Sequence, residues 1–594
     1  MSSKSVTGAY IIARTLRDLG VSVVFGLVGV PVSDIAEQAI NLGIRFIGFR
    51  NEQAASYAAT AYGYLTGKPG VCLVVGGPGV LHAIAGVGNA SANNFPFPLL
   101  GGSIETNLVT KGAFQELDSV SLLTPHTKLS IRPPNAASLP SVIANAYRCS
   151  FYGRPGTSFI DLPADIIMDP LDSLEDVEET PSVANPPAGG ADEARLFKVA
   201  QLIKGAKAPL VLIGKGAAYA RAEDVIRRLI DQTNLPFLPS PMGKGVLPDS
   251  HPRNVSSARS VALKMADVVL ILGARLNWIF HYGEPPKWNP AARFIQVDIS
   301  PEELGRNAGD AQLALVGDVN IMASQLTRLL ADWHYDPSSS GFARRLIAAK
   351  EKNEAAASAA AADPSTPLSY AYAFDVIKKA LHSLSPSEEG GTVYIAEGAN
   401  TMDISRSIFP LQHPRLRLDA GSYATMGVGL PYAIAAYEAY NGPGAQATSG
   451  PARRKKVVAI EGDSAFGFAG MEIETMARFQ MDILIFVINN GGIYFGDSSS
   501  GEDWSWRQER TVKGEPGLRS WALGWEVRYE KMAEVCGGLG YFVRTPEELH
   551  KATIEGFQAE VPVIVNVIIQ SGKLEKASFG WQVSPTKKTK TARL

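Results

Sequence analysis

Short apolar runs alternate with amphipathic stretches along most of this chain. The run Val21–Gly26 follows a helix-like stretch at Tyr10–Leu19, and later runs at Pro209–Gly214 and Ile483–Ile488 have the length of buried strands. Continuous apolar strands separated by amphipathic helices are typical of parallel sheets that helices cover on both faces. The pattern therefore predicts an α/β protein built from doubly wound parallel sheets.

Three such α/β stretches are separated by two segments of weaker pattern. Pro170–Ala194 is acidic and proline-rich, and Asp336–Pro367 combines three consecutive serines with an alanine-rich, helix-prone piece. A chain of 594 residues is also too long for a single hydrophobic core. We expect three domains and a tail, at residues 1–180, 195–335, 366–572 and 573–594. Gly442–Lys456 is expected to be a surface excursion.

Composition narrows the class of protein. Hydrophobic residues make up 46% of the chain, charged residues 19%, and the formal net charge is −2. Lys and Arg are scattered, which argues against a nucleic-acid partner, and no apolar run has the length of a membrane span. Cys72, Cys149 and Cys536 are isolated and odd in number, which favours a reducing compartment over a disulfide framework.

The clearest candidate chemistry follows two apolar runs in the last third of the chain. Lys456–Ile460 leads into Glu-Gly462-Asp463-Ser464, and Ile483–Ile488 ends in Asn-Asn490-Gly-Gly492. One strand–helix–strand unit separates Asp463 from Asn490, so both are expected at the carboxyl ends of neighbouring parallel strands. A carboxylate, an amide oxygen and backbone carbonyls suit Mg²⁺, and small residues before a helix suit a diphosphate. Taken separately, Asp463 also fits a helix cap and the asparagines fit a turn.

This Gly-Asp…Asn-Asn pattern resembles the thiamine-diphosphate fingerprint of the acetolactate synthase and pyruvate decarboxylase superfamily. The resemblance implies pyrimidine-binding, central nucleotide-binding-like and diphosphate-binding domains, in that order. It also implies that Asp463, the Asn490 side chain and the Gly492 carbonyl bind Mg²⁺, with Gly462 and Ser464 beside the diphosphate. Ser464 stands where many members have Gly, a variant of the coenzyme A branch of the superfamily.

The superfamily also requires a carboxylate in its first domain. Glu52 follows the apolar Phe49 and precedes a small-residue helix, Ser56–Leu65, where poor solvation would raise its proton affinity. The resemblance implies that Glu52 binds N1′ of the aminopyrimidine and favours its imino tautomer, through which the cofactor removes its own C2 proton. A glutamate stabilised by the helix dipole is the alternative.

Two glycine-rich segments resemble further parts of the family site. In Gly421–Pro431 the resemblance makes Gly421 part of the loop around the thiamine and Met426 the apolar wedge beneath it, although a core methionine fits equally. Gly76–Gly79 would shape the pyrimidine side of the site, or form only a turn.

The central stretch suggests a nucleotide pocket. A strand, a Gly-rich turn and a helix at Leu212–Ala220 precede Arg275 and Asp298, the latter at a strand end where it could meet ribose hydroxyls. These segments resemble the 2-hydroxyacyl-CoA lyase and oxalyl-CoA decarboxylase family, which implies ADP as a bound activator held by Arg154, Lys215, Arg275 and Asp298. Surface charges or a network between domains would explain the same residues. Arg415 and Arg417 could meet coenzyme A phosphates, or form a solvated basic loop.

Two local sequences distinguish the two activities. The sequences Arg-Asn-Glu52-Gln and Phe-Gln115-Glu116 resemble the lyases, whereas the decarboxylases have His before the glutamate and Tyr in the loop. The lyase releases a fatty aldehyde and therefore needs a proton acceptor for the 2-hydroxyl; Gln115 and Glu116 are the candidates. The resemblance thus implies cleavage of 2-hydroxyacyl-CoA to formyl-CoA and an aldehyde in fatty-acid α-oxidation. Oxalyl-CoA decarboxylation to formyl-CoA and CO₂ is the alternative.

Assembly and location are further expectations. In the superfamily the cofactor lies between two subunits, which implies a homodimer or homotetramer. The ending Ala592-Arg593-Leu594 resembles the Ser-Lys-Leu address read by the peroxisomal import receptor, unless it is only an exposed basic tail. Lys573–Pro585 could close over substrate or remain static. A cofactor-free relative, or a flavin-containing acetolactate-synthase-like enzyme, are the competing classes.

Overall fold

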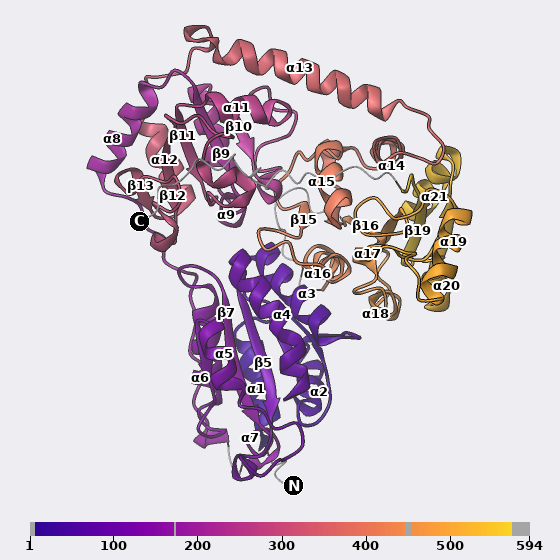
Figure 1. Cartoon of the computed structure of the whole chain (residues 1–594). Helices are drawn as coiled ribbons and strands as arrows, with labels where there is room; N and C mark the ends of the chain where they lie inside the picture. The colour runs from indigo at the N-terminus through magenta and orange to yellow at the C-terminus, as the bar shows by residue number, and fades with distance from the viewer. Residues whose placement is uncertain (1–5, 172–173, 444, 446–453, 573–594) are drawn as a thin grey trace, which may run out of the picture.

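The computed structural model of this chain describes residues 6–171, 174–443, 445 and 454–572. They form three parallel β-sheets flanked by helices, which confirms the predicted α/β class and its three doubly wound units (Figure 1). The sheets lie within the three predicted domain ranges, whose limits stay predictions. The C-terminal tail and most of Gly442–Lys456 lie outside the described residues. None of the described helices combines the length and apolar composition that crossing a bilayer requires.

The N-terminal domain contains a six-stranded sheet in the order β3-β2-β4-β5-β7-β6. Its strands are β2 (Val23–Leu27), β3 (Arg45–Gly48), β4 (Val71–Val74), β5 (Phe97–Ser103), β6 (Leu129–Ile131) and β7 (Thr157–Pro163). Its helices are α1 (Gly8–Asp18), α2 (Ser33–Asn41), α3 (Glu52–Thr66), α4 (Pro78–Asn93), α5 (Ser119–Leu123), α6 (Leu139–Phe151) and α7 (Ala164–Met168). The helix and strand predicted at Tyr10–Leu19 and Val21–Gly26 are therefore present, each with its ends moved by one or two residues.

The central domain contains a five-stranded sheet in the order β10-β9-β11-β12-β13. The strands are β9 (Pro209–Ile213), β10 (Phe237–Pro239), β11 (Val268–Leu272), β12 (Arg293–Asp298) and β13 (Ala314–Val316). The helices are α8 (Glu193–Lys204), α9 (Lys215–Tyr219), α10 (Glu223–Thr233), α11 (Arg259–Met265) and α12 (Val319–Leu329). In the preceding linker, β8 (Pro170–Leu171) pairs antiparallel with β1 (Val6–Thr7).

The C-terminal domain contains a six-stranded sheet in the order β15-β14-β16-β17-β19-β18. The strands are β14 (Thr392–Glu397), β15 (Arg417–Asp419), β16 (Lys456–Gly462), β17 (Leu484–Asn489), β18 (Leu539–Val543) and β19 (Val563–Ile568). The helices are α14 (Tyr370–Leu384), α15 (Ala399–Ile408), α16 (Gly429–Asn441), α17 (Asp463–Phe466), α18 (Glu472–Arg478), α19 (Gly501–Val512), α20 (Lys531–Val535) and α21 (Pro546–Gln558).

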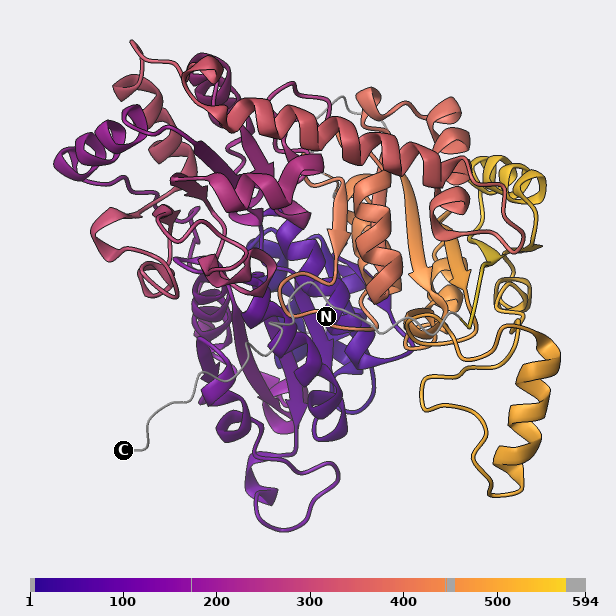
Figure 2. The ribbon, with the colours of Figure 1, turned by 45° about the horizontal axis from the view of Figure 1, so that its top comes forward.

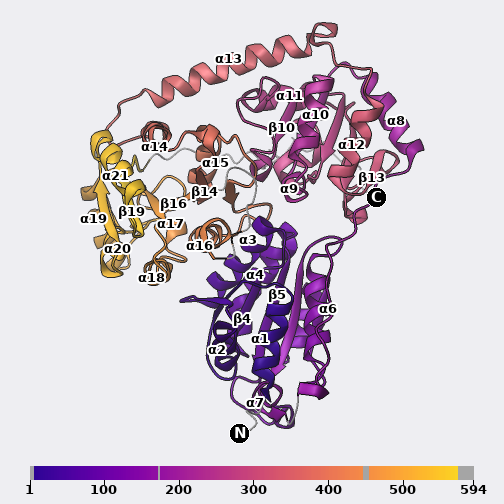
Figure 3. The same ribbon diagram turned by 180° about the vertical axis from the view of Figure 1, so that it is seen from behind.

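The three domains pack against one another, and the first and third share a core. Figures 1 and 3 show the N-terminal domain below the other two, with α3 and α4 reaching the C-terminal domain. Helices α3 and α16 contact each other, and one buried hydrophobic cluster joins residues such as Tyr57 and Ala58 of α3 to Tyr432 and Ile434 of α16. Because burial of this apolar surface favours association, the first and third domains are held in a fixed relation.

One long helix bridges the upper two domains. Helix α13 (Gly341–Ala361) arises from the alanine-rich piece of the second linker and has 21 residues. It buries only Phe342 and Leu346 near its start, and farther along Asn353 and Glu354 bond to Ser257 of the central domain. Figure 2 shows α13 crossing from the central to the C-terminal domain. Alanine has the highest helix propensity, so this exposed helix depends little on packing.

Candidate functional site

Asp463 lies where β16 ends and α17 begins. It is 3% exposed, and its carboxylate accepts hydrogen bonds from the backbone N–H groups of Ser464 at 2.7 Å and Gly492 at 3.1 Å. Burial raises the pKa of Asp463 to about 7, and these backbone N–H groups oppose that rise. Among the described residues no Lys or Arg pairs with this carboxyl group, so it is buried without a counter-charge.

Asn490 comes to the same place from the neighbouring strand. Strands β16 and β17 pair in parallel with Gly462 opposite Ile488. The Oδ1 atom of Asn490 accepts from the N–H of Gly492 at 3.2 Å, the same N–H that Asp463 accepts. The predicted meeting of the two side chains at adjacent strand ends is therefore present, whereas the Gly492 carbonyl as a metal ligand stays a prediction.

This oxygen set fits a hard cation. The described residues contain no group of three or more His, Cys, Asp or Glu side chains that could hold a metal. A metal bound here would therefore be held by Asp463, by amide and backbone oxygens, and by the oxygens of a bound anion. Mg²⁺ accepts that arrangement, because it is usually bound through one or two carboxylates together with substrate phosphates.

A pair of buried glutamates lies close to the strand end that carries Asp463. Glu397 on β14 and Glu461 on β16 are register partners and are at most 1% exposed. Glu397 accepts the N–H groups of Gly427 and, at 2.5 Å, Gly429, at the start of α16. Burial raises the pKa of both carboxyls, that of Glu397 to about 7. The sequence analysis missed this pair, although two glutamates ending adjacent buried strands are a detectable signal.

The loop Gly421–Val428 is a junction of three domains. The N–H of Ser422 donates to Asn93 Oδ1 of the N-terminal domain at 3.0 Å, and Trp278 Nε1 of the central domain donates to the Ser422 carbonyl at 2.8 Å. Gly421 has a φ of 63°, and a Cβ there would lie 2.2 Å from Asn93 Oδ1, so glycine is required. Met426 packs, partly buried, against the shared core, and its predicted role beneath thiamine stays a prediction.

Glu52 is the first residue of α3, which Asn51 caps by accepting the N–H of Gln53 at 2.7 Å. The Glu52 side chain is 11% exposed, and its Oε2 atom lies 2.9 Å from Nδ1 of His82 on α4. Behind it, Cys72 of β4 is fully buried, and burial together with the charge of Glu52 raises the pKa of that thiol. The predicted burial of Glu52 is correct. His82 was missed, because a lone histidine in an apolar helix carries no motif.

Gln115 and Glu116 lie in a loop over the start of α4. A Cβ on Gly77 would lie 2.6 Å from the Gln115 carbonyl, so the loop touches the helix N-terminus. The Glu116 carboxylate accepts backbone N–H groups from Thr110 at 2.5 Å, Gly112 at 2.8 Å and Ala113 at 3.1 Å, and these bonds lower its pKa. Glu116 therefore stabilises its own loop and is a weak base there, which argues against the predicted proton-handling role.

The predicted nucleotide residues surround a cavity of about 750 Å³ between the N-terminal and central domains. Lys215, Arg275 and Asp298 line it. Lys215 and Arg275 also join the domains, because Lys215 Nζ donates to Asn93 Oδ1 at 3.2 Å and Arg275 donates to the Ala92 carbonyl at 2.5 Å. The positions of these residues are therefore compatible both with a nucleotide pocket and with a polar network between the domains.

Arg415 and Arg417 lie elsewhere than predicted, and Arg154 lies beside the cavity, whose lining includes its neighbours Gly153 and Pro155. Arg154 is not among the residues lining that cavity; it pairs with Glu302 at 3.0 Å beside it. Arg415 and Arg417 are 1% and 2% exposed, so both the expected contact with coenzyme A phosphates and the solvated loop are wrong. Arg415 pairs with Glu223 of α10 at 2.7 Å, and burial lowers the pKa of Arg417 to about 10.

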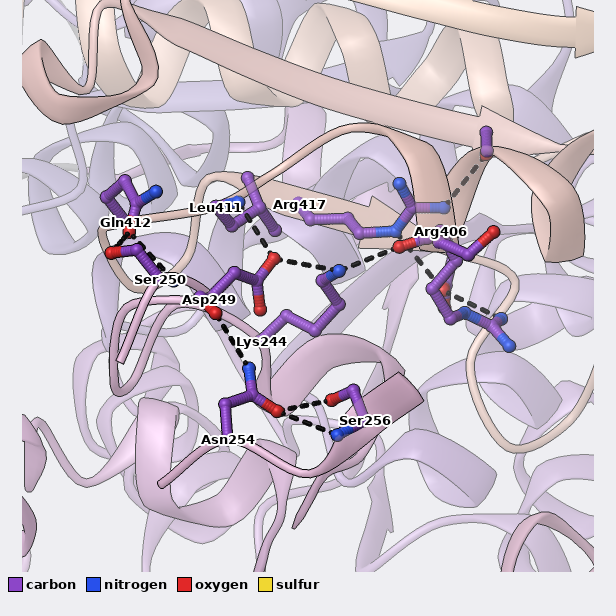
Figure 4. A network of polar contacts seen from close by, with 12 residues as sticks. Lys244, Asp249, Ser250, Asn254, Ser256, Arg406, Leu411, Gln412 and Arg417 are labelled. Carbon is purple, nitrogen blue, oxygen red and sulfur yellow. Dashed lines mark hydrogen bonds and ion pairs between the residues drawn. The ribbon is translucent and has the colours of Figure 1, made fainter. Parts of the chain in front are cut away.

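A second cavity, of about 540 Å³, lies between the central and C-terminal domains. On one wall Lys244 Nζ bonds to Asp249 at 2.8 Å and to the Arg406 carbonyl at 2.7 Å, as Figure 4 shows. Lys350 of the bridging helix α13 also lines this cavity. The cationic and imidazole side chains lining the cavity are Lys244, Arg259, His281, Lys350 and Arg406. The sequence analysis did not single out this cavity, because its wall combines residues far apart in the chain.

The three-sheet architecture agrees with comparisons to known proteins. Three models of the thiamine pyrophosphate enzymes match: the N-terminal TPP binding domain at residues 6–122, the central domain at 196–326 and the C-terminal TPP binding domain at 397–567. This chain belongs to the thiamine pyrophosphate enzyme family.

Its relatives narrow the class. The chain is 43% identical to human 2-hydroxyacyl-CoA lyase 1 over 585 residues, covering 98% of this chain and 97% of that protein. It is 40% identical to the Saccharomyces cerevisiae 2-hydroxyacyl-CoA lyase over 96% and 98% of the two chains. Identity to the Escherichia coli K12 oxalyl-CoA decarboxylase is 38%, over 95% and 94%. The chain is thus a thiamine-diphosphate-dependent enzyme related to these coenzyme A-linked enzymes.

Proposed function

We propose that this enzyme is a 2-hydroxyacyl-CoA lyase, which cleaves its substrate to formyl-CoA and a fatty aldehyde. The observation that carries the proposal is near-full-length identity of 40 to 43% to proteins named for that activity. The local sequences around Glu52 and Gln115 support it against the decarboxylase. Oxalyl-CoA decarboxylation remains the second candidate, because that enzyme is 38% identical over a similar length.

The proposal assigns separate tasks to the residues described above. Asp463 and Asn490 would hold Mg²⁺ and through it the diphosphate, and the absence of a counter-charge at Asp463 supports that assignment. Glu52 would hold N1′ of the aminopyrimidine with the carboxylate oxygen that does not contact His82. Bound thiamine diphosphate supplies the electron sink for carbon–carbon cleavage. Glu397 would keep the Gly427–Gly429 turn in place through its two backbone contacts.

The coenzyme A part of the substrate would occupy the 540 Å³ cavity. Its phosphates carry negative charge. Among the cations that line the cavity, Lys244, Lys350 and Arg406 pair with the lining carboxylates Asp249, Glu354 and Asp403. Arg259 pairs with no carboxylate among the described residues, so it is the cation available to a phosphate. Gly421 of the predicted thiamine loop lines it as well, so a thioester held there would face that loop. Replacement of Arg259 by Ala should raise the KM for acyl-CoA with a smaller effect on kcat.

A direct substrate comparison tests the function. The purified enzyme, supplied with thiamine diphosphate and Mg²⁺, is incubated in parallel with a 2-hydroxyacyl-CoA and with oxalyl-CoA, and aldehyde and CO₂ are measured. The lyase assignment predicts aldehyde from the first substrate and little CO₂ from the second. Turnover of oxalyl-CoA alone would select the decarboxylase. Glu52→Gln is the control, because it should keep the fold and abolish most turnover with either substrate.

The other cavity, of 750 Å³, would hold ADP as an activator. Lys215 and Arg275 would meet its phosphates and Asp298 the ribose, and their positions on the cavity wall support this. Calorimetric titration with ADP tests the assignment, with Asp298→Asn as the weakened variant. Flavin absorbance in the purified protein would contradict it.

Assembly and location complete the proposal. We infer a homodimer or homotetramer in which each cofactor lies between subunits, and sedimentation of an active monomer would contradict this. We also infer import into peroxisomes, through the receptor that reads the C-terminal Ala592-Arg593-Leu594. Fluorescence microscopy of the tagged chain with and without these residues tests that inference.

A further inference from the structure

His82 stands out because it is the one side-chain partner of Glu52 that the described part of the chain provides. Nδ1 of His82 lies 2.9 Å from Oε2 of Glu52, which is hydrogen-bond distance. The two residues come from different helices, since Glu52 begins α3 and His82 lies in the second turn of α4. Two separate helix starts therefore bring a carboxyl and an imidazole together.

The two side chains differ sharply in their access to solvent. The side chain of Glu52 is 11% exposed and that of His82 is 58% exposed. Nε2 of His82 has no hydrogen-bond partner among the described residues. The imidazole thus connects a nearly buried carboxyl to the surface of the domain, with one nitrogen on each side.

A connection to solvent would serve the proposed function. Glu52 would give its proton to N1′ of the cofactor and take it back in each cycle, and a relay would let that proton exchange with water. Carboxyl groups with little solvent contact exchange protons slowly unless a titratable neighbour relays them, and histidine is the side chain best suited to do so near neutral pH. Glu116, the other acidic candidate, is committed to the backbone of its own loop.

We propose that His82 is the proton relay between Glu52 and the solvent-exposed side of the site; this inference rests on the proposed function. When Glu52 releases its proton from Oε2 to Nδ1, the imidazole releases the proton on Nε2 to water. When Glu52 takes a proton back, the transfer runs in reverse through the same two nitrogens. No bond other than N–H and O–H changes, and the ring returns to its starting tautomer after each forward and reverse pair.

Two substitutions separate a relay from a residue that only positions Glu52. In His82→Asn the side-chain amide can still donate to Oε2, whereas it cannot transfer a proton. In His82→Ala both abilities are lost. The relay predicts that turnover falls in both variants by a similar factor, on the order of 100-fold or more. Turnover near wild type in His82→Asn would reduce His82 to a positioning residue and overturn the relay.

A second measurement is independent of the acyl-CoA substrate. Exchange of the C2 hydrogen of bound thiamine diphosphate with D₂O is followed by acid quench and NMR, and the dissociation constant of the cofactor by calorimetry. The relay predicts that C2 hydrogen exchange is slower in His82→Asn than in the wild type, while the dissociation constant of the cofactor is unchanged. Exchange should be slowest in Glu52→Gln. Exchange at the wild-type rate in His82→Asn would overturn the proposal.

The controls keep this result distinct from the proposed function. His550→Asn removes an exposed histidine of α21 and should leave turnover and exchange unchanged. If the enzyme binds thiamine diphosphate and shows the slowed exchange, the relay stands even when the preferred acyl-CoA differs from the proposed one. If it binds no thiamine diphosphate, the proposed function fails first, and the relay fails with it.

Discussion

Replacing Glu223 by Gln removes the counter-charge of a guanidinium that is wholly buried between two domains. The Arg415 side chain is 0% exposed and that of Glu223 is 15% exposed. The two terminal guanidinium nitrogens contact the Glu223 carboxylate at 2.7 Å and 3.3 Å. Losing one partner of a buried pair costs about 3 to 5 kcal/mol, because the remaining charge stays desolvated. Arg415 would keep its bond to the Ala218 carbonyl, so we expect the lower end of that range.

Urea unfolding of the wild type and the variant provides the measurement. The control is Glu302→Gln, which removes another ion pair between domains. In that pair Glu302 lies 3.0 Å from Arg154. Its side chains are 50% and 44% exposed, so its loss should cost under about 1 kcal/mol. The double variant Glu223→Met, Arg415→Met should recover most of the stability, since a buried ion pair can be exchanged for apolar side chains of similar volume. Equal small losses in the Glu223 and Glu302 variants would refute the reasoning.

Further outcomes follow from the site. Burial raises the pKa of Glu472 to about 7, above its ordinary value, so its stabilising contribution is complete at low pH and is lost as pH rises through about 7. The variant Glu472→Gln should therefore be more stable than the wild type at pH 8, by about 1 to 3 kcal/mol. Equal slopes of stability against pH in the two proteins would contradict this. Gly429→Ala would place a Cβ 2.1 Å from Glu461 Oε1, and calorimetry should show a loss of about 1 to 3 kcal/mol. Asp463→Asn should weaken Mg²⁺-dependent cofactor binding at least about 10-fold by titration, and unchanged affinity would remove Asp463 from the metal site.

Sequence patterns correctly predicted those elements that depend only on residues close together in the chain. The apolar run Ile483–Ile488 became β17, displaced by one residue, because a buried parallel strand needs only a continuous hydrophobic stretch. The meeting of Asp463 and Asn490 was also predictable, since one strand–helix–strand unit places two successive strand ends side by side. Glu52 was identified because the family that the strand ends resemble requires a carboxylate in its first domain, and its helix start and small-residue surroundings fit that requirement.

Contacts between distant segments could not be predicted in this way. Arg415 and Glu223 are 192 positions apart in the chain, and their pairing depends on how two domains dock. A pattern of basic residues cannot distinguish such a buried pair from a solvated loop, which is why the expectation for Arg415 was wrong. His82 was invisible for a similar reason, because its partner lies on another helix. Glu116 looked like a free carboxylate until the fold of its loop was known.

The length of the bridging helix α13 fixes the distance between the two domains that it connects, which limits the construction of chimeras between related enzymes. Its 21 residues span about 31 Å at 1.5 Å per residue, and a helix neither stretches nor shortens under small loads. One inserted residue would lengthen the connection by about 1.5 Å and turn its far end by about 100°. A chimera with a foreign central domain would therefore need a bridging helix of the same length and rotational phase. Otherwise the residues of α13 that line the interdomain cavity would be displaced from it.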